Sequence, residues 1–290
     1  MKIAILDDYA RAALRLADWS EIAVRAEVVA FDRHLTPEEI PDALAGFEVI
    51  CTVRERSAIS ADTLARLPQL RMITVTDSRV RSVDLAAATA RGIVVSEARP
   101  PGETPPPNHA AAEFTWALLL ALVRHIPAEA ASLRAGRWQS SLGLALAGRT
   151  LGLVGFGRIG RQVARYAAAF GMNVLAWSQN LTAADADAGG AKRVEKRELF
   201  SASDVISVHY LLSTRSRGIV GRDDIAAMKP SAYLINTSRG PLIDEDALIA
   251  ALRGKRIAGA ALDVFNREPL PKDHPLLALD NAVLTPHLGF

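Results

Sequence analysis

The sequence has little of three features that would each point to a particular class of protein. Cys51 is its only cysteine, which excludes an intramolecular disulfide and any metal site built from several thiolates. Its 34 basic and 32 acidic residues nearly cancel, so it lacks the broadly basic surface that nucleic-acid backbones require. We therefore expect a cytoplasmic protein that holds no metal and does not bind nucleic acid.

Long apolar runs are also missing. The longest, Ala110 to Val123, is interrupted by Glu113 and falls short of the roughly 18 to 20 residues that span a bilayer. The first residues, MKIAILDDYA, are too short an apolar stretch for a signal peptide and are typical of a buried strand. We therefore expect neither a membrane span nor a secretion signal.

Short runs of Val and Ile alternate with Ala-, Leu- and Arg-rich segments of helical period along the whole chain. This alternation predicts βαβ units with parallel sheets, and 290 residues favour two domains over one. The predicted strands lie at 2–6, 27–31, 49–53, 71–75, 93–95, 150–154, 173–177, 205–208, 232–236, 257–263 and 282–284.

A proline cluster divides the pattern. Five prolines between Pro100 and Pro107 prevent a regular helix or a central strand, because proline lacks an N–H and restricts the residue before it. We predict two doubly wound α/β lobes, residues 1–100 and 108–290, joined by a hinge at 101–107. Asn108 is a candidate N-cap for a long, nearly apolar helix that runs to about His125.

The second lobe contains a glycine loop. In LVGFGRIGRQVARY, Gly155, Gly157 and Gly160 follow a strand and open an amphipathic helix, with Arg158 and Ile159 before the third glycine. Glycine permits the tight turn and the approach of a pyrophosphate to the helix N-terminus. A purely structural turn is the alternative, but this context predicts a dinucleotide site.

The end of the next strand does not say which dinucleotide binds. The sequence AWSQNLT places Ser178 and Gln179 where a carboxylate would hold the ribose of NAD or a basic residue would accept the 2′-phosphate of NADP. Lys192 and Arg193 follow nearby, so NAD and NADP are both open. His209 ends another strand of this lobe, where we expect an ordinary strand-end role.

Polar residues gather where the last strands end. The stretches YLINTSRGPLIDEDAL, GAALDVFNREPLP and VLTPHLGF carry Arg239, Asp263, Glu268 and His287. Ligands of doubly wound sheets sit outside the carboxyl ends of the strands, so parallel strands would place these side chains on one rim. Each residue alone is more often an ordinary surface or loop residue, but together they predict a catalytic cleft.

Together with the glycine loop, these stretches resemble the D-isomer-specific 2-hydroxyacid dehydrogenases, glyoxylate and hydroxypyruvate reductases among them. NTSRG, ALDV, EPLP and PHLG occur in the family's order; the resemblance is dense from Leu151 to Gly289 and looser before Pro107. It implies a flavodoxin-like substrate lobe, a Rossmann cofactor lobe, dimers, and hydride transfer between NAD or NADP and a small 2-hydroxy or 2-oxo acid.

The resemblance also implies residue roles. Arg239, Glu268 and His287 fall on the catalytic residues, Asp263 on the aspartate that holds the nicotinamide carboxamide, and Thr237 on the cofactor site. The chemistry agrees, because reduction of a carbonyl needs a proton donor, which an imidazole supplies near neutral pH. A fork-shaped guanidinium can bind the substrate carboxylate.

The first lobe departs from the family pattern. Its expected substrate loop reads TVTDSRVRSVD, where Ser78 and Arg79 are the candidate substrate-binding residues and Asp77 stands at a usual glycine. That carboxylate opposes an anionic substrate unless Arg79 or Arg81 offsets it. The proline-rich connection and the ending, where family members continue with a helix, also differ. A non-catalytic dinucleotide-binding protein, a redox sensor or partner module, is therefore the alternative.

Overall fold

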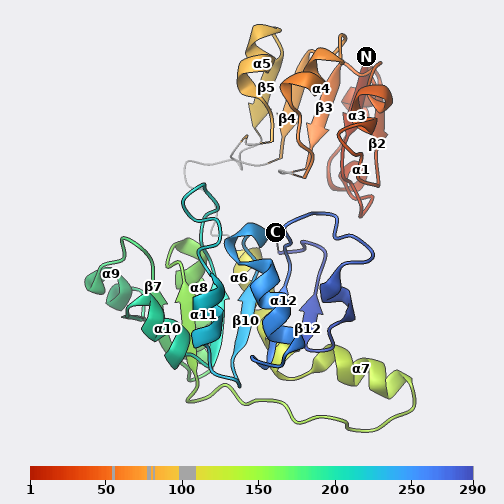
Figure 1. The fold of residues 1–290 in the computed structure, drawn as a ribbon. Helices are drawn as coiled ribbons and strands as arrows, with labels where there is room; N and C mark the ends of the chain where they lie inside the picture. The colour runs from red at the N-terminus through yellow and green to blue at the C-terminus, as the bar shows by residue number, and fades with distance from the viewer. Residues whose placement is uncertain (54–55, 77–79, 81, 98–108, 290) are drawn as a thin grey trace. The chain divides into compact units, whose positions relative to one another are not determined.

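The structure is a computed structural model that describes residues 1–289 except 54–55, 77–79, 81 and 98–108. The chain divides into two compact units, residues 1–106 (unit 1) and 107–290 (unit 2) (Figure 1). The hinge predicted at 101–107 and the N-cap predicted at Asn108 lie outside the described residues and stay predictions.

Unit 1 is built on a five-stranded parallel sheet in the order β2-β1-β3-β4-β5. The order reverses between β1 and β3, which is the flavodoxin-like arrangement of a doubly wound sheet. Ile50 and Ile73 from the sheet and Leu64 from a helix form part of its fully buried core. Its elements are β1 (Lys2–Ile5), α1 (Ala13–Leu16), α2 (Ser20–Ala23), β2 (Glu27–Ala30), α3 (Glu39–Ala43), β3 (Val49–Thr52), α4 (Ala61–Ala65), β4 (Met72–Val75), α5 (Leu85–Ala90) and β5 (Val94–Glu97).

Unit 2 is built on a seven-stranded parallel sheet in the order β12-β11-β10-β9-β6-β7-β8. The order reverses between β6 and β9, as in dinucleotide-binding Rossmann folds. Its strands are β6 (Thr150–Val154), β7 (Asn173–Trp177), β8 (Lys192–Arg193), β9 (Val205–Val208), β10 (Tyr233–Asn236), β11 (Gly259–Leu262) and β12 (Ala282–Leu284). Its helices are α6 (His109–Val123), α7 (Ile126–Arg134), α8 (Arg158–Ala169), α9 (Ala183–Ala188), α10 (Lys196–Ala202), α11 (Arg222–Ala227) and α12 (Glu245–Arg253), with 3-10 turns η1 (Gly240–Leu242) and η2 (Pro275–Ala278).

Two hydrophobic cores lie on opposite faces of this sheet. Successive strand residues point to opposite faces, so Leu234 packs with α10, α11 and α12, whereas Tyr233 and Ile235 pack with α6 and α8 (Figure 1). Apolar residues on both faces explain why these strands appear in the sequence as continuous apolar runs. The predicted fold class, two doubly wound parallel-sheet lobes, is confirmed.

The parallel direction of the strands decides where the site lies. The carboxyl ends of β6, β10, β11 and β12 share one edge of the unit 2 sheet. The glycine turn, Arg239, Asp263 and His287 follow these four strands in turn. The edge that sequence reasoning selected therefore carries all of them.

No single helix among the described residues is long and apolar enough to cross a membrane. Only α6 and α7 taken together reach that length and composition, and their axes bend by 59° where they meet.

Candidate active site

A histidine–glutamate pair lies at the carboxyl edge of the unit 2 sheet. The Nδ1 atom of His287 lies 2.6 Å from Oε2 of Glu268, and the two side chains are 17% and 29% exposed. The other carboxylate oxygen, Oε1, accepts the Phe265 N–H at 2.9 Å. Among the described residues Nε2 of His287 has no hydrogen-bond partner, so it is the ring nitrogen that can face a reactant.

The charge state of Glu268 depends on its neighbours. Burial by itself raises the pKa of this carboxyl group, but the hydrogen bond and charge of His287 act in the opposite direction. The Phe265 N–H and the charge of Arg239 add to them, and the pKa of Glu268 ends below its ordinary value. Glu268 is therefore an anion that can orient the imidazole and stabilise its protonated form.

Arg239 is held by its own loop after β10. The Asn236 side chain donates to the Arg239 carbonyl at 2.9 Å and accepts the Ser238 N–H at 3.0 Å. A side chain at Gly240 would collide with the Phe265 backbone, so the arginine and glutamate loops pack directly on each other. Sequence reasoning assigned no role to Asn236; an asparagine directly after a buried strand, before SRG, was the available signal.

Asp263 follows β11 and is fully buried. Its carboxylate accepts hydrogen bonds from the Thr285 hydroxyl and from the N–H groups of Leu288 and Gly289. The segment that carries His287 is thus attached to the end of β11. The contact with a nicotinamide carboxamide that the resemblance implied stays a prediction.

The glycine turn between β6 and α8 leaves space where a dinucleotide would need it. Gly155 has a φ of 94°, and a Cβ atom there would lie 2.5 Å from the His209 carbonyl oxygen. Gly157 is the N-cap of α8, and a Cβ atom there would meet nothing within 4 Å. Among the described residues no side chain caps α8, and its first turn holds no acid. Its N–H groups fit a pyrophosphate.

Two alanine substitutions separate the folding and binding roles of this turn. Gly155→Ala forces a strained φ and a backbone clash, so we expect a loss of about 2 kcal/mol or more in the free energy of unfolding, together with loss of cofactor binding. Gly157→Ala adds a methyl group to open space, so we expect unchanged stability and at least about tenfold weaker cofactor binding.

Thermal melts and fluorescence titration with reduced cofactor measure both effects. Equal affinity of Gly157→Ala and the unmodified protein would contradict a pyrophosphate at this turn.

Thr237 is linked to α6. Its hydroxyl oxygen lies 2.6 Å from that of Thr115, which also hydrogen-bonds the Ala111 carbonyl oxygen at 2.7 Å. Because a carbonyl only accepts, Thr115 donates to Ala111 and Thr237 must donate to Thr115. The Thr237 oxygen is therefore an acceptor, which fits the N–H or O–H donors of a nicotinamide nucleotide.

The end of β7 carries no acid within AWSQNLT. Trp177 stacks on Tyr210 with ring centroids 6.2 Å apart, and the Tyr210 hydroxyl lies 3.4 Å from the Gln179 N–H, beside Ser178. Arg193 is held by the Leu181 carbonyl at 3.0 Å and by Glu195 at 2.9 Å. Lys192 and Arg193 are both exposed on the edge strand β8, where they pair with Leu175 and Ala176 of β7.

His209 lies directly behind the glycine turn. Its Nε2 atom is 2.9 Å from the Ser207 hydroxyl, while its Nδ1 atom is buried without a hydrogen-bond partner among the described residues. Burial lowers the pKa of His209 from 6.5 to about 4. The ring is therefore neutral at physiological pH.

This burial predicts an acid sensitivity. The pKa of His209 in the folded protein lies below its value in the unfolded chain. The contribution of the neutral His209 to the free energy of unfolding is therefore complete above pH 6.5 and is lost as the pH falls toward 4. Between about pH 7 and about pH 4.5 the free energy of unfolding should fall by up to about 2.5 kcal/mol less in His209→Gln than in the unmodified protein.

Urea denaturation at several pH values measures the difference. His109→Gln, at an exposed position, is the control; an acid dependence of His209→Gln equal to that of the control would refute the argument.

The first-lobe candidates cannot be placed. Ser78, Arg79, Asp77 and Arg81 lie outside the described residues. Their substrate-binding roles, and the effect of Asp77, stay predictions.

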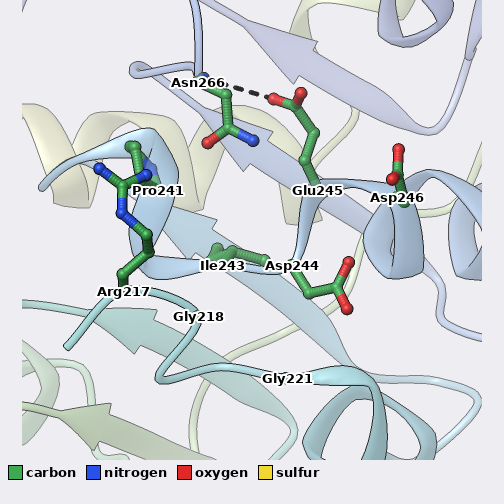
Figure 2. A pocket seen from close by; sticks show the side chains of 9 residues that line it. All are labelled: Arg217, Gly218, Gly221, Pro241, Ile243, Asp244, Glu245, Asp246 and Asn266. Carbon is green, nitrogen blue, oxygen red and sulfur yellow. Dashed lines mark hydrogen bonds between the residues drawn. The ribbon is translucent and has the colours of Figure 1, made fainter. Parts of the chain in front are cut away.

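A pocket of about 380 Å³ lies next to the arginine loop (Figure 2). Its lining includes Arg217 and the start of α12, and the Glu245 carboxylate accepts the Asn266 N–H at 3.4 Å. None of the predicted catalytic or cofactor residues lines it. The pocket is therefore separate from the histidine–glutamate pair.

Comparison with known proteins identifies two family models that match the chain. Residues 116–289 match the family model described as D-isomer specific 2-hydroxyacid dehydrogenase, NAD binding domain. Residues 3–186 match the model described as the catalytic domain of the same dehydrogenases.

Individual relatives carry related names. A D-3-phosphoglycerate dehydrogenase from Methanocaldococcus jannaschii is 40% identical over 88% of this chain and 48% of its own length. A glyoxylate reductase from Aeropyrum pernix is 38% identical over 79% of this chain and 70% of its own. The crystal structure of a phosphoglycerate oxidoreductase from Vibrio cholerae superposes with a TM-score of 0.91 at 36% identity, covering 100% of this chain and 92% of that one.

Proposed function

Because the chain belongs to the D-isomer specific 2-hydroxyacid dehydrogenase family, we propose that it transfers hydride between a nicotinamide cofactor and a small 2-hydroxy or 2-oxo acid. The observation that carries the proposal is the 2.6 Å contact between His287 and Glu268. The pair lies at the same sheet edge as Arg239 and the glycine turn, which supports a proton donor, an anion-binding group and a cofactor site at one edge.

Each residue has a distinct task in the proposed reduction. The cofactor, when bound at the glycine turn, supplies the hydride that reaches the carbonyl carbon. Arg239 binds the substrate carboxylate and polarises the carbonyl, because its guanidinium is permanently charged and fork-shaped. Nε2 of His287 gives its proton to the carbonyl oxygen as negative charge develops there. Glu268, which contacts Nδ1 of His287, holds the ring in place and stabilises its imidazolium form. Oxidation of the alcohol uses the same groups in reverse.

The relatives narrow the choice of substrate among the 2-hydroxy and 2-oxo acids. The chain spans about half the length of the first curated relatives it matches, 48% for the Methanocaldococcus protein. Their names as phosphoglycerate dehydrogenases therefore indicate a substrate class to test and not a specific substrate. Together with the glyoxylate reductase, they support a short 2-oxo acid or its 3-phosphorylated counterpart.

We expect both NAD and NADP to be accepted. Ser178 and Gln179 replace the carboxylate that would repel a 2′-phosphate, and the neighbouring strand β8 carries two exposed basic residues, Lys192 and Arg193. The cytoplasmic location expected from the sequence stays a prediction.

A panel assay tests the proposal. Reduced nicotinamide absorbance is followed with glyoxylate, hydroxypyruvate, pyruvate and phenylpyruvate, with NADH and NADPH in parallel. The reverse reaction is run with 3-phosphoglycerate and each oxidised cofactor. We expect turnover with at least one pair. Cofactor binding without turnover on any of these acids would favour the non-catalytic alternative.

We also propose a homodimer formed through the segment that follows α7. Trp138 and Leu142 are 80% and 92% exposed and lie four residues apart on one segment, so they can contribute to a shared apolar patch of the kind that marks an interaction site. The segment is ordered by the Glu129 carboxylate, which accepts hydrogen bonds from the hydroxyls of Ser140 and Ser141 at 2.7 and 2.6 Å. α7 and this segment project from the rest of unit 2 (Figure 1), so a second copy can cover them.

The exposed pair makes the dimer testable. In sedimentation experiments we expect twice the chain mass for the unmodified protein. We expect at least about hundredfold weaker association for the double variant Trp138→Ser, Leu142→Ser, because buried aromatic anchors dominate such interfaces. Leu16→Ser, at an 84% exposed position elsewhere, is the matched control. An unmodified protein that stays monomeric at all concentrations refutes the proposal.

A further inference from the structure

The segment that carries His287 has an unusual backbone. His287 has a φ of 56°, in the left-handed region that non-glycine residues seldom adopt. Such a conformation persists only where the surroundings enforce it. The bond from the His287 N–H to the Thr285 carbonyl at 3.0 Å is local and does not attach the segment to the sheet.

The Thr285 N–H donates to the Leu262 carbonyl at 3.0 Å, which ties the start of the segment to β11. Asp263 attaches the residues that follow. Its Oδ1 atom accepts the Thr285 hydroxyl at 2.6 Å and the Leu288 N–H at 2.8 Å, and its Oδ2 atom accepts the Gly289 N–H at 2.8 Å. These three donors flank His287 on both sides. A side chain at Gly289 would put a Cβ atom 3.1 Å from Oδ2, so the glycine allows this close approach.

The burial of Asp263 argues against a role limited to the cofactor. A carboxylate offers about four acceptor positions, and the terminal segment uses three of them. Asp263 is 0% exposed, so a carboxamide could reach the remaining position only after a neighbouring group moves.

We propose that Asp263 is a positioning residue that fixes the 285–289 segment, and thereby the contact between His287 and Glu268. This inference rests on the proposed function for its catalytic meaning. The structural part of it holds without any substrate.

Substitution in the cofactor-free protein tests the structural part. Asp263→Asn turns an amide group toward one of the three donors and replaces a charged acceptor by a neutral one. We expect amide exchange at Leu288 and Gly289 to become at least about tenfold faster. We also expect the NMR titration midpoint of Glu268 to rise by about one pH unit. Burial raises the pKa of this carboxyl group, and a displaced His287 would lower it less strongly.

Two further variants keep the test decisive. Thr285→Val removes one of the three donors, so it should move both readouts in the same direction by a smaller amount, even if Asp263→Asn fails to fold. Asp204→Asn is the matched control: Asp204 accepts the Thr150 N–H at 2.9 Å but precedes β9, at the amino edge of the sheet. It should leave the Glu268 midpoint unchanged. Unaltered exchange and midpoint in both Asp263→Asn and Thr285→Val would overturn the proposal.

A double-mutant cycle tests the catalytic part. If Asp263 acts through His287, adding Asp263→Asn to His287→Asn should lower kcat by less than about twofold further. A role confined to the cofactor predicts additive losses instead, which would overturn the assignment. Absence of turnover in the unmodified protein would refute the proposed function, while the exchange and titration results would still decide the positioning role.

Discussion

The His287→Asn variant is expected to lose about 10² to 10⁴-fold in kcat/KM for reduction of a 2-oxo acid while its cofactor affinity stays within about twofold. Asparagine cannot transfer a proton, and Nε2 of the imidazole is the donor in the proposed reaction. Steady-state kinetics and fluorescence titration with reduced cofactor measure the two quantities on the same preparation.

His274 provides a matched control for this variant. It is a half-buried histidine of the same unit, with Nε2 3.4 Å from Oε1 of Glu245, and it caps the 3-10 turn η2 instead of contacting Glu268. We expect His274→Asn to keep its activity within about twofold. Equal losses in the two variants would mean that a histidine–carboxylate pair matters for stability rather than for proton transfer.

The Arg239→Gln variant is expected to lose about 2 to 5 kcal/mol of transition-state binding, or about 30-fold to several thousand-fold in kcat/KM. Glutamine keeps a polar, though shorter, side chain and removes the charge and the fork that bind a carboxylate. We expect KM to rise and kcat to fall, because the guanidinium acts on both the carboxylate and the polarised carbonyl. Initial rates across a range of 2-oxo acid concentrations separate the two.

The pocket of Figure 2 supplies a control variant for this test. Arg217 lines that pocket, whereas Arg239 does not. Arg217→Gln should keep kcat/KM within about twofold if the substrate binds beside His287. A loss that follows Arg217 instead of Arg239 would place the substrate in the pocket and contradict the proposed site.

Local sequence patterns predicted most of the fold. The strands with continuous apolar runs were found at nearly their observed bounds, because burial on both faces leaves a signal that needs no knowledge of the partners. β8 was missed. Its two residues, Lys192 and Arg193, carry no apolar pattern, and only pairing with β7 makes them a strand.

The parallel strands predicted which residues share one sheet edge, but not the contacts between them. Parallel strands place Arg239, Asp263 and His287 at one edge, and this followed from the strand order alone. The 2.6 Å contact between His287 and Glu268 and the attachment of the terminal segment to Asp263 join residues 19 to 26 positions apart. Such contacts depend on how loops fold back, which the local pattern does not encode.

Asn236 and Thr285 illustrate the same limit. Each is a small polar residue close in sequence to a predicted catalytic residue. Asn236 hydrogen-bonds the Arg239 backbone, and Thr285 hydrogen-bonds the Asp263 carboxylate. Their roles appear only when hydrogen-bond partners are known.

The most direct test of the central claim, hydride transfer at the His287–Glu268 pair, is to follow a labelled hydride. The full-length protein is incubated with reduced cofactor that carries deuterium at the transferable position and with a 2-oxo acid from the panel. We expect a D-2-hydroxy acid with one deuterium on the former carbonyl carbon, and no labelled product with His287→Asn. A protein that binds the cofactor but yields no labelled hydroxy acid from any 2-oxo acid would contradict it.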